Sequence, residues 1–132
     1  FQFGRTCAHA AVIKTGFMTC QECGECWVGP ENINELDIKK TRIAWDLALE
    51  TIAQGHHELL ILDEIFHAVN LKLVSPDELM RVLRQAPASI EIVMTGRQAA
   101  AELIEMADLV TEMKMIKHPY SQGYKARRGI EY

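Results

Sequence analysis

The sequence lacks the features that mark membrane proteins, secreted proteins and general nucleic-acid binders. No apolar run approaches the length needed to span a bilayer, and no secretory signal pattern is visible. Lys and Arg number 14 against 18 Asp and Glu, so the formal net charge is -4, whereas a nucleic-acid binder would carry a basic face. We therefore expect a cytoplasmic protein that has neither a membrane nor a nucleic acid as partner.

The four cysteines also lack the spacing of a disulfide framework, because three of them crowd into one loop as Cys20, Cys23 and Cys26. A reducing compartment is therefore the better expectation. Three thiols at this spacing can wrap a single zinc ion or hold three corners of an iron–sulfur cluster, with Cys7 or His9 completing the set. Three free thiols in a loop are the alternative, and the sequence leaves both interpretations open.

What the sequence does contain is an alternation of apolar runs and amphipathic stretches. Its 132 residues fit one domain, spanning 1–132, that can bury a core. The pattern predicts strands at 1–3, 10–18, 59–62, 90–94 and 109–116, and helices at 34–54, 75–86 and 98–107. Strands that alternate with helices imply parallel βαβ units, so we expect an α/β fold with a doubly wound sheet.

Two of the predicted helices carry clear boundary signals. Gly55 is placed to end the first, and Ser75, Pro76 and Glu78 form a strong start for the second. The spacing predicts one apolar stripe on each helix. The stripes consist of Leu36, Ile43 and Leu47 on the first helix and Leu79, Val82 and Leu83 on the second.

The stretch Leu59-Leu60-Ile61-Leu62-Asp63-Glu64 is the most informative part of the chain. Its apolar residues are typical of a strand buried on both faces, and it ends in two adjacent carboxylates. Ligands of open α/β sheets bind beyond the carboxyl ends of the strands. The stretch therefore has the Walker B pattern, in which the Asp helps to hold Mg²⁺ in nucleotide-using proteins. A strand whose polar end simply meets solvent is the alternative.

A series of short motifs follows in the last third of the chain: Thr95-Gly96-Arg97, Glu102-Leu103-Ile104, residues 107–113, residues 116–120, Gly123 and residues 126–131. The series resembles the P-loop-type corrinoid adenosyltransferases, in which such motifs recur in the same order. Upstream, the residues that agree with the family are Gly16, Phe17, Asp37, Arg42, Trp45, Asp63 and Glu64. The resemblance therefore covers residues 16–132.

This resemblance implies an enzyme that transfers the 5′-deoxyadenosyl group of ATP to the Co(I) of a corrinoid such as cobalamin, in adenosylcobalamin synthesis or salvage. Triphosphate is the product that leaves. The implied fold is of the P-loop NTPase, RecA-like type, with a mostly parallel sheet covered by helices on both faces. The implied cofactors and partners are ATP, Mg²⁺ or Mn²⁺, a corrinoid, an electron-donating reductase and a second copy of the chain in a homodimer.

The chemistry of the residues agrees with the implied activity. Asp63 and Glu64 are hard oxygen donors suited to Mg²⁺, which would neutralise charge on the leaving triphosphate. Arg97 follows a strand end, where its forked donors would clasp phosphate oxygens, and Thr95 with Gly96 lets the backbone approach the nucleotide. We therefore expect catalytic roles for Asp63, Glu64 and Arg97. A surface ion pair is the alternative for Arg97.

Phe17 and Trp27 are expected on the corrinoid side, where the resemblance implies aromatic residues that displace the lower axial ligand of cobalt. The family has its Trp directly after Gly-Phe-Thr, whereas here Met18 follows Phe17, so Trp27 is the nearest candidate. His118 and Tyr120 resemble a family segment close to the active site. A histidine in such a place is more often structural than catalytic.

One element of the family is absent, because no Gly-x-x-x-x-Gly-Lys-Ser/Thr loop occurs in the 132 residues. The chain begins with Phe1, inside a predicted strand, rather than with Met. We therefore expect the first strand and its phosphate-binding loop to precede Phe1 in the natural polypeptide. Without that loop, the alternatives are a non-catalytic corrinoid- or nucleotide-binding module and a P-loop ATPase subunit.

Overall fold

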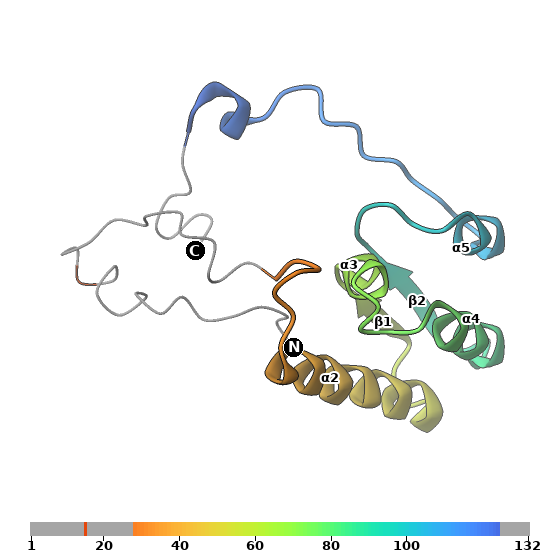
Figure 1. Ribbon diagram of the computed structural model, residues 1–132. Coiled ribbons are helices and arrows are strands. Elements are labelled where there is room, and N and C mark those ends of the chain that lie inside the picture. Colours follow the sequence, from red (N-terminus) through yellow and green to blue (C-terminus); the bar gives the residue numbers. More distant parts are fainter. Residues whose placement is uncertain (1–14, 16–27, 125–132) are drawn as a thin grey trace. The chain divides into compact units, whose positions relative to one another are not determined.

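The computed structural model describes Thr15 and residues 28–124, and the chain divides into two compact units, 1–100 and 101–132 (Figure 1). The first unit contains α2 (Glu35–Gln54), β1 (Leu59–Leu62), α3 (Ile65–Asn70), α4 (Pro76–Gln85) and β2 (Glu91–Met94). The second contains α5 (Ala101–Met106) and the short 3-10 helix η1 (Pro119–Gln122). The strands expected at 1–3 and 10–18 lie outside the described residues. None of the helices that the structure describes is both long and apolar enough to cross a bilayer.

The two strands form a parallel pair, with Leu59 opposite Glu91 and Leu62 opposite Met94. The predicted α/β class with a parallel sheet is therefore confirmed. The prediction that β1 is buried on both faces is wrong, because Leu59 and Ile61 are 54% and 57% exposed. An apolar run fits a strand with one covered face as well as a strand with two, since alternate residues point to opposite sides. Helices over both faces of the sheet are thus not observed in the described part of the first unit.

Helix α2 occupies the range that the sequence pattern predicts, and Gly55 ends it as expected. Asn34 is the N-cap, and the side chains of Asn34 and Asp37 each accept a hydrogen bond from the other's backbone N–H, at 3.1 and 3.0 Å. Gly55 ends the helix in the left-handed conformation, with φ of 63°. Both predicted boundaries are confirmed.

The buried face of α2 is not the predicted one, because Leu36, Ile43 and Leu47 are all exposed. The buried residues of this helix are Asp37, Thr41, Trp45, Ala48 and Ile52. Thr41 can lie there because its hydroxyl donates a hydrogen bond to the carbonyl oxygen of Asp37 at 2.9 Å. A search for apolar residues at helical spacing therefore does not identify this buried face. The face includes polar residues such as Thr41, whose hydroxyl finds its hydrogen-bond partner within the same helix.

Helix α4 follows the start signal in the sequence. The Ser75 hydroxyl accepts a hydrogen bond from the Glu78 N–H at 3.4 Å, and Pro76 occupies the first turn. Leu79 is fully buried, while Val82 and Leu83 are half-buried. The predicted face of this helix is thus the one that contacts the core.

Ser75→Ala is expected to lower the free energy of unfolding by about 1 kcal/mol, because the Glu78 N–H loses its acceptor at the start of α4. Urea unfolding followed by circular dichroism measures the change. Ser89→Ala is the matched control, since Ser89 is exposed and lies in a turn outside the helices and strands. An equal loss in both variants would contradict the capping role.

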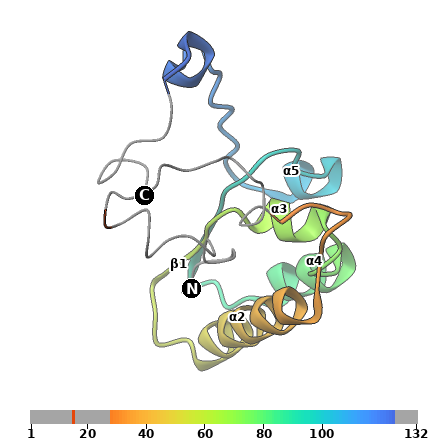
Figure 2. The ribbon, with the colours of Figure 1, turned by 60° about the vertical axis from the view of Figure 1, so that its left-hand side comes forward.

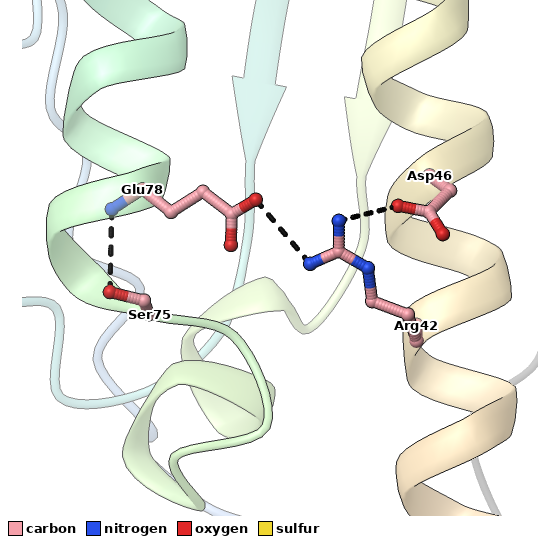
Figure 3. A network of polar contacts seen from close by, with 4 residues as sticks. All are labelled: Arg42, Asp46, Ser75 and Glu78. Carbon is pink, nitrogen blue, oxygen red and sulfur yellow. Dashed lines mark hydrogen bonds and ion pairs between the residues drawn. The ribbon is translucent and has the colours of Figure 1, made fainter.

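Arg42 connects α2 and α4, which are neighbours in both views of the first unit (Figures 2 and 3). Its guanidinium pairs with Asp46 at 2.7 Å on α2 and with Glu78 at 3.4 Å on α4. The hydrogen bond with Asp46 raises the pKa of Arg42, so this side chain stays cationic. Exposed ion pairs of this kind contribute little to stability. Arg42 thus has structural partners and does not belong to the site described below.

The second unit, described by itself, departs most from the sequence-based expectations. The helix expected at 98–107 is present as α5. The prediction of a strand at 109–116 is wrong, because these residues form no regular element. Apolar side chains such as Leu109 and Met113 are largely exposed there. A strand requires a neighbour that takes up its backbone hydrogen bonds, and the described residues of this unit include no strand.

Candidate functional site

The carboxyl ends of β1 and β2 bring together residues that the sequence singled out. Because the strands are parallel and Leu62 pairs with Met94, the residues that follow them, Asp63 and Thr95, lie at the same edge of the sheet. We call Asp63, Glu64, Thr95, Gly96 and Arg97 the strand-end cluster.

The Thr95 hydroxyl joins the two strand ends. It donates a hydrogen bond to Oδ1 of Asp63 at 2.6 Å and accepts one from the Glu64 N–H at 2.8 Å. Glu64 has a left-handed backbone, with φ of 53°, which is uncommon for a residue with a side chain. The hydroxyl therefore holds both the Asp63 carboxylate and the turn that leads from β1 into α3.

Gly96 adopts a backbone conformation that few other residues tolerate, with φ of 141°. A Cβ at this position would lie 2.9 Å from Cβ of Phe66 in α3, closer than real Cβ atoms approach. The loop after β2 thus packs directly against α3, and any side chain at position 96 would push the two apart.

Gly96→Ala is expected to lower the free energy of unfolding by about 1–3 kcal/mol, because the new methyl group adds both backbone strain and the clash with Phe66. Urea unfolding measures the loss. Gly55→Ala is the matched control, since Gly55 also has positive φ but has no neighbouring atom within 4 Å of an added Cβ. The control places a Cβ at positive φ without a clash, so a loss at Gly96 no larger than the loss at Gly55 would contradict the close contact.

Arg97 combines a fixed backbone with an available side chain. Its carbonyl oxygen accepts a hydrogen bond from Nδ2 of Asn70 at 3.2 Å. The side chain is exposed, and its guanidinium has no hydrogen-bond or ion-pair partner among residues 28–124. The surface ion pair considered as an alternative is therefore not observed in that range. An exposed guanidinium of this kind is suited to an anionic ligand.

Asp63 and Glu64 are the candidates for Mg²⁺ in the strand-end cluster. Both residues are exposed, and the hydrogen bond from Thr95 occupies one oxygen of Asp63. No group of three or more His, Cys, Asp or Glu side chains in the described part of the chain could hold a metal ion by itself. Mg²⁺ commonly takes one or two carboxylates and completes its shell with water and substrate phosphates. The pair therefore fits a metal ion that arrives with a nucleotide.

The remaining predicted site residues lie elsewhere in the chain. His118 is the N-cap of η1, where its Nδ1 accepts a hydrogen bond from the Tyr120 N–H at 3.1 Å. This hydrogen bond occupies Nδ1 of His118, and the side chain of Tyr120 is exposed. The predicted residues that lie outside the described part of the chain are Phe17, Cys20, Cys23, Cys26 and Trp27.

Two residues that shape the site, Phe66 and Asn70, were not found from the sequence. Both lie on α3, a six-residue helix that the sequence did not predict. Its N-cap is Glu64, whose side chain makes no capping hydrogen bond, so the usual start signal is absent. A helix of this length completes fewer than two turns, which leaves no periodic pattern to detect.

The sequence model of one protein family, described as ATP:corrinoid adenosyltransferase BtuR/CobO/CobP, matches residues 1–132. The chain is similar to proteins named corrinoid adenosyltransferase from Sinorhizobium sp, at 40% identity over 97 residues, and Pseudomonas aeruginosa, at 34% over 109 residues. A third, from Escherichia coli, is 30% identical over 98 residues. These alignments cover 73%, 83% and 74% of this chain but 45%, 54% and 50% of the relatives. The chain thus spans about half the length of these curated relatives.

Proposed function

Because this chain belongs to the ATP:corrinoid adenosyltransferase family, we propose that the protein transfers the 5′-deoxyadenosyl group of ATP to the Co(I) of a corrinoid. The Co(I) ion supplies the electron pair of the new bond to C5′, and triphosphate leaves with the electron pair of the broken C5′–O bond. The protein then has to align the carbon with cobalt and stabilise the charge that develops on triphosphate.

The observation that carries this proposal is the arrangement of the strand-end cluster. Two exposed carboxylates lie with a guanidinium at the carboxyl edge of a parallel sheet, which is where nucleotides bind in such folds. Asp63 and Glu64 would hold Mg²⁺ or Mn²⁺, which neutralises charge on the leaving triphosphate when it is bound. Arg97 would donate to phosphate oxygens, and Gly96 would let the backbone approach them.

The corrinoid side of the reaction involves residues outside the strand-end cluster. In this proposal Phe17 and Trp27 crowd out the lower axial ligand of cobalt, so that Co(II) is more easily reduced by a separate electron-donating reductase. His118 and Tyr120 are the candidates for further contacts with the substrates. The proposed complete protein has a RecA-like P-loop NTPase fold and works as a cytoplasmic homodimer.

Cys20, Cys23 and Cys26 are proposed as a zinc or iron–sulfur site near the corrinoid. Metal and sulfide analysis of protein purified without oxygen tests this. Stoichiometric zinc, or iron with sulfide, that disappears in Cys23→Ser supports the site. Protein that contains neither metal at stoichiometric level removes it.

The proposed reaction is tested on the complete gene product, incubated without oxygen with ATP, Mg²⁺ and reduced corrinoid. Equal amounts of adenosylated corrinoid and triphosphate are expected. Formation of ADP and phosphate instead would identify an ATPase. Binding of ATP or corrinoid without any product would identify a non-catalytic binding module. Either of these results overturns the proposed transfer.

A further inference from the structure

We propose that Thr95 is a positioning residue, whose hydroxyl fixes the Asp63 carboxylate for the metal ion of the bound nucleotide. The inference rests on the proposed function, in which Asp63 binds Mg²⁺. Thr95 acts through Asp63 and needs no contact of its own with the metal. With Oδ1 of Asp63 engaged by the hydroxyl, Oδ2 is the oxygen left for the ion.

The direction of the hydroxyl proton follows from the two hydrogen bonds of Thr95. A hydroxyl has a single proton to donate and two lone pairs that accept. The Glu64 N–H donates to one lone pair at 2.8 Å, and the proton goes to Oδ1 of Asp63 at 2.6 Å. A bond of that length is typical of a hydroxyl that donates to an ionised carboxylate. Successive hydrogen bonds of this kind also polarise one another, which favours the ordered arrangement.

The backbone of Thr95 is held in place by the sheet. The Thr95 N–H donates to the carbonyl oxygen of Leu62 at 3.2 Å, so the backbone of Thr95 continues the pairing of β1 with β2. Asp63, in contrast, is exposed and lies past the last paired residue of β1. An exposed carboxylate loses rotamer freedom when it binds a ligand. A carboxylate that a hydrogen bond already holds in one rotamer loses less entropy on binding. A rigid element thus orients a side chain that would otherwise sample several rotamers.

A purely structural tie between the strand ends is the competing explanation for these hydrogen bonds. Such a tie would affect stability without any specific effect on metal affinity. A positioning role makes the effect of Thr95 depend on the carboxylate of Asp63. The two explanations therefore differ in metal affinity and in the coupling between positions 95 and 63.

The test measures Mn²⁺ binding to the complete gene product with ATP, by the enhancement of water-proton relaxation, in the absence of corrinoid. Thr95→Val replaces the hydroxyl by a methyl group and is expected to weaken Mn²⁺ binding by about 10- to 100-fold, as is common when the partner of a metal ligand is removed. Thr95→Ser keeps the hydroxyl and should bind Mn²⁺ as the natural protein does. In an Asp63→Asn background, Thr95→Val should cause no additional loss.

Three results would overturn the positioning role: natural Mn²⁺ affinity in Thr95→Val, the same loss in Thr95→Ser, or an undiminished Thr95→Val effect in Asp63→Asn. If Thr95→Val does not fold, as judged by circular dichroism, Thr95→Ala takes its place with the same expectation. Protein that shows the expected coupling but forms no adenosylated corrinoid supports the positioning role and overturns the proposed function. Active protein whose Mn²⁺ affinity is unchanged by Asp63→Asn supports the proposed function and overturns the positioning role.

Discussion

Asp63→Asn is expected to slow adenosyl transfer by about 10³-fold, because several kcal/mol of charge stabilisation on the leaving triphosphate is lost with the ionic ligand. Asn has nearly the shape of Asp, so the substitution removes the negative charge with little change in packing. Asp63 is exposed, so the stability of the fold should change little. The rate of formation of adenosylated corrinoid at saturating ATP measures the loss, and the thermal midpoint verifies the fold.

Glu58→Gln is the matched control for Asp63→Asn, because Glu58 immediately precedes β1 and lies at its opposite end. Its side chain is exposed, and its backbone carbonyl accepts the Glu91 N–H at 2.8 Å, a bond that the substitution leaves in place. Transfer should be normal in this variant. Normal turnover in Asp63→Asn would mean that the metal site lies elsewhere. Equal losses in both variants would point to a general effect of charge.

The parts of the fold that sequence predicted well are those set by local chemistry. Asn34 and Gly55 bound α2, and Ser75 starts α4, because capping depends on a few neighbouring residues. The site followed from equally local information: two apolar runs that end in Asp63 and Thr95 lie in parallel strands, so both ends meet at one edge. Short-range patterns therefore located the candidate site, although they did not test the role of any residue in it.

The parts that sequence missed depend on contacts between distant residues. Which face of α2 is buried depends on what packs against it, and Trp45 rather than Leu47 faces the interior. The hydrogen bond of Thr95 with Asp63 spans 32 positions and requires both strand ends to be placed first. The prediction of a strand at 109–116 failed for the same reason, since a strand forms only when a neighbouring strand takes up its backbone hydrogen bonds. Spacing within one segment carries no information about such partners.

Arg97→Ala is expected to lower kcat/KM for ATP by about 10²-fold, because the proposed transition state loses a forked donor to the departing triphosphate. Steady-state kinetics with varied ATP measure this. The exposed side chain has no partner in residues 28–124, so the unfolding free energy should stay close to that of the natural protein. Arg81→Ala is the control, since Arg81 is an exposed cation on α4, and it should leave the kinetics unchanged.

The class of ligand that Arg97 contacts can be separated from a general effect of charge. Arg97→Lys keeps the positive charge but loses the planar fork, so an intermediate loss of about tenfold is expected. Inorganic triphosphate, used as an inhibitor, should lose affinity for Arg97→Ala in parallel with ATP, whereas adenosine should not. If adenosine loses affinity as well while triphosphate does not, the guanidinium contacts the nucleoside, and the strand-end cluster binds ATP in a different orientation from the one proposed.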